Sequence, residues 1–185
     1  MRITQPGDPP PNPKHRWVFP LLLLLFVGGL CTPLGVVYYH NKVVEHNQNE
    51  VIDALRKYAQ LQRAVFARRQ HYAAAFDELS DPDWAQVRDT SALNPTDYHG
   101  YRFRLFTSSG GDGGVNFIDK NGHMSGGYGL VAMPARYGVT GRFTFFISAP
   151  GDTLYYFDLG VKTDEAVRAL DQYFVPPAAR EMKGG

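Results

Sequence analysis

The stretch WVFPLLLLLFVGGLCTPLGVVYY, residues 17–39, contains no formally charged side chain. As an α-helix it would extend about 35 Å at roughly 1.5 Å per residue, and the hydrocarbon core of a bilayer is roughly 30 Å thick. Trp17 stands at one end and Tyr38 and Tyr39 at the other, which is typical of residues at membrane interfaces. The sequence therefore predicts a transmembrane anchor over residues 17–39.

The residues before this anchor set its expected orientation. Residues 1–16 hold Arg2, Lys14 and Arg16 against Asp8, and their five prolines favour a short disordered cytoplasmic tail. Because basic flanks stay inside, we expect a single-pass protein of the bacterial inner (cytoplasmic) membrane, with a cytoplasmic N-terminus and a periplasmic C-terminal domain. A cleaved signal peptide is the alternative, although its apolar region is normally only about 7–15 residues long.

Charge and cysteine content restrict the partners. Residues 40–185 hold 16 Lys and Arg against 17 Asp and Glu, so this part has no basic surplus for binding phosphates, and we expect no nucleic-acid partner. Cys31 is the single cysteine, which excludes an intrachain disulfide and a cysteine-based metal cluster. The expected partners are the lipid bilayer and other membrane-anchored subunits, in a homo- or hetero-oligomer.

A long helix is predicted after the anchor. Residues 36–81 contain neither glycine nor proline, and apolar residues recur there at alternating steps of four and three. This series consists of Val51, Leu55, Tyr58, Val65, Tyr72, Phe76 and Leu79, with Gln62 and Arg69 in the two remaining positions. The pattern predicts an amphipathic helix within residues 40–79. Asn47 or Asn49 is a candidate cap for a separate helix, and a helix continuous with the anchor is the alternative.

The periodicity changes to two after a turn-rich stretch at residues 80–97. Tyr101, Phe103 and Leu105 alternate with arginines, which predicts a half-buried strand. Further strands are predicted at residues 115–119, 128–133, 143–148 and 154–159, separated by turns rich in glycine, proline and aspartate. Thr163 is a candidate cap for a short C-terminal helix, and residues 176–185 form a loose tail in this interpretation.

Together these segments predict an α+β fold. An N-terminal transmembrane helix continues into, or is followed by, a long amphipathic helix that packs on the one apolar face of a small antiparallel β-sheet, with a short C-terminal helix. The expected divisions are the tail at residues 1–16, the anchor at 17–39, the amphipathic helix at 40–79, the sheet head domain at 80–175 and the loose tail at 176–185.

This plan resembles type IV pilins and pseudopilins, and the stretch AQLQRAVFARRQHYAAAFDEL (59–79) is similar to their helices before the head domain. However, the acidic residue and the processing site of pilins have no counterpart between Asp8 and Glu45. The segments YHGYRFRLF (98–106), GHMSGGYGLVAMPARYG (122–138) and LYYFDLG (154–160) resemble an uncharacterised bacterial envelope family. That resemblance implies an anchored or exported domain and assigns no activity.

Two short segments have features of catalytic or metal-binding sites, but both are also typical of structural turns. Ser125, in the order His-Met-Ser-Gly-Gly, has some similarity to a nucleophile turn, but a glycine-rich β-turn is the favoured interpretation. Asp119, Asn121 and His123 alternate like metal ligands, yet Asp-Lys-Asn-Gly is typical of a hairpin turn. We therefore assign no catalytic, cofactor-binding or metal-binding residue, expect no cofactor and do not expect an enzyme.

The function expected from the sequence is that of a non-catalytic, membrane-anchored structural or assembly subunit facing the extracytoplasmic side. Partner helices would contact small or apolar positions: Gly28, Gly29, Pro33, Val51, Leu55 and Tyr58. One alternative is an accessory subunit of a larger inner-membrane complex. A second alternative is an anchored ligand-binding module or hydrolase.

Overall fold

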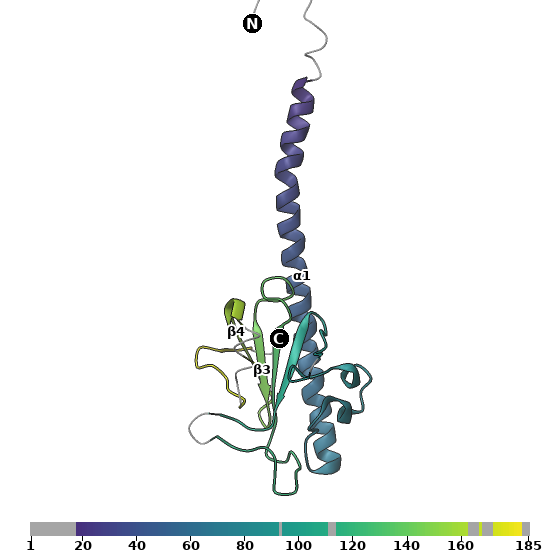
Figure 1. Ribbon diagram of the computed structural model, residues 1–185, viewed down its shortest axis with the longest axis vertical. Helices are drawn as coiled ribbons and strands as arrows, with labels where there is room; N and C mark the ends of the chain where they lie inside the picture. Colours follow the sequence, from purple (N-terminus) through teal and green to yellow (C-terminus); the bar gives the residue numbers. More distant parts are fainter. Residues whose placement is uncertain (1–17, 93, 111–113, 163–166, 168–171, 183–185) are drawn as a thin grey trace, which may run out of the picture. The chain divides into compact units, whose positions relative to one another are not determined.

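The computed structural model describes residues 18–92, 94–110, 114–162, 167 and 172–182, with side chains from Gly35 onward. The chain divides into two compact units, residues 1–41 and residues 42–185. The longest element is helix α1, Val18–Arg69 (Figure 1). The second unit holds the sheet and the described hydrophobic core.

The expected fold class included a transmembrane helix, and this expectation is wrong. Among the described residues, no helix combines the length and the apolar character that a bilayer crossing needs. From Gly35, where side chains are first described, the uncharged part of α1 lasts only to Asn41, which is about 10 Å of helix. The remainder of the expected anchor, residues 17–34, lies outside the described side chains. What the structure contains is one long helix and an antiparallel sheet.

The amphipathic helix also ends before the predicted residue 79. It stops at Arg69, and Gln70 adopts a left-handed backbone conformation with a φ of 60°. The chain then turns back, and the Tyr72 N–H donates to the Met124 carbonyl at 2.8 Å. A separate 3-10 helix, η2 (Phe76–Leu79), follows. The apolar spacing continued past the end of α1 because Tyr72 and the apolar residues of η2 pack on the same core.

Gln62 holds this turn in place. Its side chain is fully buried within the apolar stripe of α1. The amide Nε2 donates to the Ala73 carbonyl at 3.0 Å, and Oε1 accepts the Ala73 N–H at 2.8 Å. The same nitrogen donates to the Tyr58 hydroxyl at 2.6 Å. A buried amide satisfied in this way binds the returning chain to the helix.

The five strands form one antiparallel sheet in the order β1-β2-β3-β4-β5, so each strand lies beside its neighbour in sequence. They are β1 (Tyr101–Phe106), β2 (Gly129–Pro134), β3 (Thr144–Ser148), β4 (Thr153–Phe157) and β5 (Arg180–Glu181). Two further 3-10 helices are η3 (Trp84–Gln86) and η4 (Gly160–Lys162). The predictions of β1 to β4 are confirmed to within two residues, whereas residues 115–119 contribute only isolated bridges.

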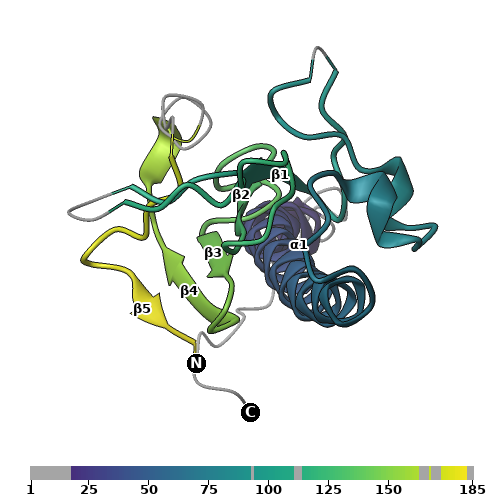
Figure 2. The same ribbon diagram turned by 90° about the horizontal axis from the view of Figure 1, so that it is seen from below.

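Both faces of the central strands β2 and β3 are buried, which corrects the expectation of one apolar face. The first face packs on α1, which lies beside β1, β2 and β3 (Figure 2). The second face carries a smaller cluster made of Phe106, Val131, Met133, Phe146, Val167 and Tyr173. All six residues of β2 are buried. A strand covered on both faces has a continuous apolar sequence, as GLVAMP does here. The predicted short C-terminal helix falls on residues 163–166 and 168–171, outside the described residues.

The two edges of the sheet differ. At the outer edge of β1, the Thr90 N–H donates to the Phe103 carbonyl at 2.9 Å, and the Leu105 N–H donates to Asp89 Oδ2 at 2.6 Å. The opposite edge is β5, whose two residues are both exposed. Figure 2 shows β5 at the end of the sheet farthest from α1. The sheet thus has a covered edge and an open edge.

Candidate functional site

The predicted hairpin turn at residues 119–122 is confirmed. The Gly122 N–H donates to the Asp119 carbonyl at 3.0 Å, and Gly122 has a φ of 82°. The Asp119 carboxylate accepts the N–H groups of His123 at 2.9 Å and Asn121 at 2.8 Å. These hydrogen bonds, first of all that from His123, lower the pKa of the Asp119 carboxyl group. The Asp119 carboxylate therefore stabilises the turn through these backbone hydrogen bonds. The described residues contain no group of three or more side chains suited to hold a metal ion.

Within the described part of the chain, the Ser125 hydroxyl forms no hydrogen bond with a histidine ring, and only the Ser125 backbone N–H contacts a histidine, donating to the His123 carbonyl at 3.0 Å. The Ser125 hydroxyl donates to Asp119 Oδ2 at 3.4 Å. The ring of the neighbouring His123 stacks on His71, with ring centroids 4.7 Å apart and planes 8° from parallel. A serine nucleophile needs a base within about 2.6–3.2 Å of its hydroxyl. Among the described residues, Ser125 therefore has no histidine base in the position that the hydrolase hypothesis requires.

The partner contacts expected on α1 fall into two groups. Val51, Leu55 and Tyr58 are fully buried, and they pack inside the second unit rather than on its surface. Tyr58 lies edge to face on Trp84 and on Tyr128, with ring centroids 5.0 Å and 5.4 Å away. Gly28, Gly29 and Pro33 lie in α1 but outside the described side chains, so their contacts stay a prediction.

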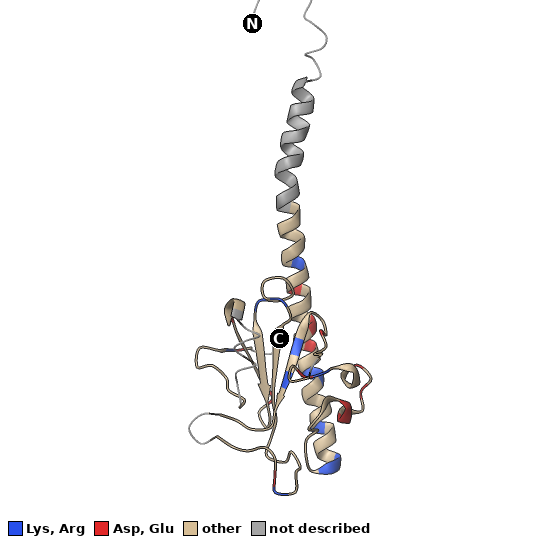
Figure 3. Cartoon of the chain, in the orientation of Figure 1, with Lys and Arg blue, Asp and Glu red and all other residues tan. Residues whose placement is uncertain are grey.

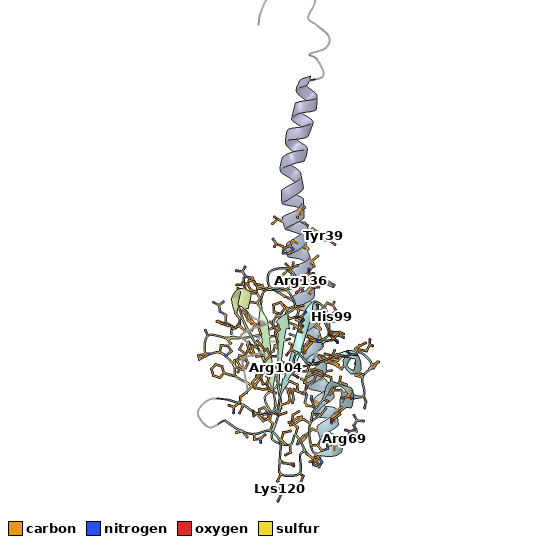
Figure 4. The ribbon with its side chains drawn as sticks, in the orientation of Figure 1. Tyr39, Arg69, His99, Arg104, Lys120 and Arg136 are labelled. Atoms are coloured by element: carbon orange, nitrogen blue, oxygen red, sulfur yellow. The ribbon has the colours of Figure 1, made fainter. Side chains whose placement is uncertain are left out.

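An exposed apolar surface lies earlier in α1. Val36, Val37, Tyr38 and Tyr39 are between 58% and 72% exposed. Successive helical residues are turned by about 100°, so these four side chains surround the helix. Figure 4 shows the Tyr39 side chain projecting from α1. A helix that is apolar on all sides is normally buried, so this exposed apolar segment, residues 36–39, is a candidate contact surface.

A groove lies between α1 and the open end of the sheet in the second unit. Two hollows of 480 and 450 Å³ share Phe143 and Tyr156, whose rings pack edge to face at 5.3 Å. The larger hollow is lined by Gln48, Asn49, Ile52, Phe143, Phe145, Tyr156, Glu181 and Met182. The smaller is lined by Phe143, Tyr156, Phe157, Asp158, Ala178 and Arg180. Each volume suits a small ligand, since ligand pockets measure about 300–1,000 Å³. We call the two together the aromatic groove.

The charged residues that line the aromatic groove differ in the hydrogen bonds and ion pairs that they form. Asp158 accepts hydrogen bonds from the Tyr137 hydroxyl at 2.9 Å, the Gly160 N–H at 2.9 Å and Arg142 Nε at 3.0 Å. Burial alone raises the pKa of Asp158, but these bonds outweigh it and lower the pKa. The Arg180 side chain, in contrast, forms no hydrogen bond or ion pair with the described residues, although its backbone pairs with Tyr156 in the sheet. Elsewhere in the second unit basic and acidic residues are interspersed (Figure 3).

Sequence reasoning missed the aromatic groove for a physical reason. Phe143 and Tyr156 fit an alternating strand pattern. That pattern predicts which face of the sheet they lie on, but not how much of this face α1 covers. β5 lies within residues 176–185, which the sequence favoured as a loose tail. Arg180 and Glu181 are two consecutive polar residues, so the period-two pattern gave no signal for β5.

The comparisons with known proteins place most of this groove within one family. Residues 79–180, more than half of the chain, match the family described as "Protein of unknown function (DUF2950)". The chain belongs to the DUF2950 family. The DUF2950 region contains β1 to β4 and the first residue of β5, whereas the α1 side of the groove lies before it. The expected membership of an uncharacterised family is thereby confirmed. No curated protein and no solved structure matches the chain, and the pilin-like architecture is not confirmed.

Proposed function

We propose that this DUF2950 protein is a non-catalytic structural or assembly subunit of the bacterial envelope. The observation that carries the proposal is the exposed apolar segment of α1, where four consecutive large side chains have no cover among the described residues. Burying such side chains against a partner is favourable by roughly 25 cal/mol per Å² of apolar surface. Burial of this segment would therefore favour association with a partner, and the hydrophobic core of the second unit would not have to change.

The proposed place of action is the outer face of the bacterial cytoplasmic membrane. The support is the sequence of residues 17–39, an uncharged apolar run that favours contact with lipid or with other apolar segments. The proposal requires that this segment contacts lipid or other apolar segments. It does not depend on the single-pass span, which the described helices do not provide.

Site-specific photo-crosslinking in intact cells tests the assembly. A photoreactive amino acid is introduced at Tyr38, and at Asn41 as the control, since Asn41 is an exposed polar residue one turn further along α1. We expect products containing two or more copies of the chain from position 38 and much weaker ones from position 41. Val37→Lys should reduce these products several-fold, because burying a lysine is costly, whereas Asn41→Lys should leave them unchanged.

The same experiment separates the proposal from its alternative. A single product with one different protein would favour an accessory subunit of a larger inner-membrane complex. Crosslinks to no protein, with the full chain recovered from the aqueous fraction after cell lysis, would overturn both assembly and membrane attachment.

A further inference from the structure

The hairpin turn at residues 119–122 carries an Asn-Gly pair at its exposed tip. Asn121 and Gly122 are both exposed, and the neighbouring Lys120 marks this tip in Figure 4. Within the part of the chain that the structure describes, Asn121 forms its hydrogen bond through the backbone N–H, and its side-chain amide has no partner. A Cβ atom added at Gly122 would meet nothing within 4 Å. The main chain after Asn121 is therefore open to the Asn121 side chain.

An asparagine followed by glycine is able to modify itself. The Gly122 main-chain nitrogen loses its proton and attacks the side-chain carbonyl carbon of Asn121. A C–N bond forms and the side-chain nitrogen leaves, taking up the proton as ammonia, so that a five-membered succinimide remains. Water then adds to one of the two ring carbonyls and opens the ring, which gives aspartate or isoaspartate. The first step is intramolecular, and water is the one co-reactant of the sequence.

Asp119 holds the turn in a conformation that opposes this attack. Its carbonyl accepts the Gly122 N–H at 3.0 Å, so the attacking nitrogen is already hydrogen-bonded. Its carboxylate accepts the N–H groups of Asn121 at 2.8 Å and His123 at 2.9 Å. Its own N–H donates to the His123 carbonyl at 2.8 Å. Ring closure therefore requires a local opening of the turn, which these hydrogen bonds resist.

We propose that Asn121 is a site of spontaneous conversion to aspartate and isoaspartate in the folded protein, and that Asp119 sets the rate by keeping the turn closed. The Asn-Gly pair supplies the reacting groups, and the hydrogen bonds of the turn supply the control. This proposal uses only the hairpin at residues 119–124, so it does not depend on the assembly function proposed above.

The modification would change how this hairpin is held at the end of α1. The Tyr72 N–H, just after the helix, donates to the Met124 carbonyl at 2.8 Å. Isoaspartate adds one methylene group to the main chain of the turn, which is incompatible with the hydrogen bond between Gly122 and Asp119. Both products also place a second carboxylate beside that of Asp119, and like charges repel. We expect the modified hairpin to be held less tightly at the end of the helix.

The test follows the freshly purified full chain during incubation at neutral and mildly alkaline pH. Peptide mass spectrometry measures the replacement of the amide NH2 group by OH, and chromatography separates aspartate from isoaspartate. We expect conversion at Asn121, faster at the higher pH because the attacking nitrogen must lose its proton. Asn116 is the internal control. It is also exposed, but the residue after it is Phe117, whose N–H donates to the Thr107 carbonyl at 2.7 Å.

The variant Asp119→Ala measures the control that the turn exerts. We expect it to raise the rate in the folded protein about fivefold, the factor that corresponds to one hydrogen bond of about 1 kcal/mol. In urea, where the turn is lost, the original chain and Asp119→Ala should convert equally fast. Asp77→Ala is the matched control, since Asp77 is an exposed aspartate of η2 outside the hairpin. Thermal unfolding of each variant checks that the fold is unchanged.

Hydrogen exchange at the Tyr72 amide measures the consequence, and we expect faster exchange in the isoaspartate fraction. Three results would overturn the proposal. Conversion of Asn121 in urea but not in the folded protein removes the site. Equal rates in the folded original chain and in folded Asp119→Ala remove the control by the turn. Conversion of Asn116 as fast as that of Asn121 shows that exposure decides the rate, rather than the Asn-Gly turn.

Discussion

One row of side chains crosses the α1 face of the sheet and changes character from one end to the other. It begins at Phe103 in β1, passes Ala132 and Phe145, and ends at Tyr156 in β4 and Arg180 in β5. Phe103, Ala132 and Phe145 are at most 1% exposed, whereas Tyr156 is half-buried and Arg180 is exposed. All five share one face, so the difference reflects what lies over them. We call the β1 side the closed end and the β4–β5 side the open end.

The closed end is covered in two ways. Trp84 of η3 is fully buried and packs its ring on Phe103 and Phe76, with centroids 5.1 Å and 5.5 Å away. The residues that follow η3 also satisfy the outer edge of β1 through Thr90 and Asp89. The open end has no such cover among the described residues. We infer that the closed end carries most of the stability of the second unit.

The largest expected effect contrasts two aromatic residues of this row. Phe103→Ala should lower the free energy of unfolding by about 3–5 kcal/mol, because it removes a fully buried ring and leaves a cavity. Tyr156→Ala should cost only about 1–2 kcal/mol, since part of its ring is already in water. Urea unfolding of the full chain measures both. Equal losses would contradict the division into a closed and an open end.

A smaller effect is expected at the covered edge. Asp89→Ala removes the acceptor of the Leu105 N–H at 2.6 Å and of the Ser91 N–H at 2.7 Å. Leaving a partly buried donor without a partner should cost about 1–3 kcal/mol. The control is Asp83→Ala, which breaks an exposed ion pair with Lys57 and should cost about 1 kcal/mol or less. If both variants lose the same amount, the Asp89 contact does not stabilise the edge.

The closed end was largely predictable from the sequence. Tyr101, Phe103 and Leu105 alternate strictly with Arg102 and Arg104, which fixes the face that each side chain takes. The stripe of Val51, Leu55 and Tyr58 has the helical period that places it on that face. Local periodicity therefore determined which elements form and which of their faces are apolar.

The end of α1 and the open end were not predictable in the same way. The apolar series continues through Tyr72 and Leu79, and only the buried amide of Gln62 marks the place where the chain turns back. That signal is a tertiary one, because the partner of Gln62 is eleven residues away in sequence. The aromatic groove depends on how much of the sheet α1 covers. Side-chain periodicity does not indicate over which strands the helix lies.

A pH-dependent effect is expected at the open end. The pKa of Asp158 is lowered in the folded protein, because the donors Tyr137, Gly160 and Arg142 outweigh the effect of burial. The stability that it contributes is thus present above its unfolded pKa of about 3.9 and is lost as the pH falls through the folded pKa. We expect the free energy of unfolding to fall less steeply with acidification in Asp158→Asn than in the original chain. Unfolding curves between about pH 5 and pH 2 measure this, and parallel acid limbs would exclude the contribution.

The smallest expected effect compares two arginines at opposite ends of the sheet. At the closed end, Arg104 donates to the Val167 carbonyl at 2.7 Å and lies 4.9 Å from the centre of the Phe106 ring. Arg104→Ala should therefore cost about 1–2 kcal/mol of unfolding free energy. Arg180→Ala should change it by less than about 0.5 kcal/mol, because the Arg180 side chain is exposed and makes no polar contact with the described residues. A loss at Arg180 as large as that at Arg104 would make Arg180 a structural residue and would contradict the contrast between the closed and the open end.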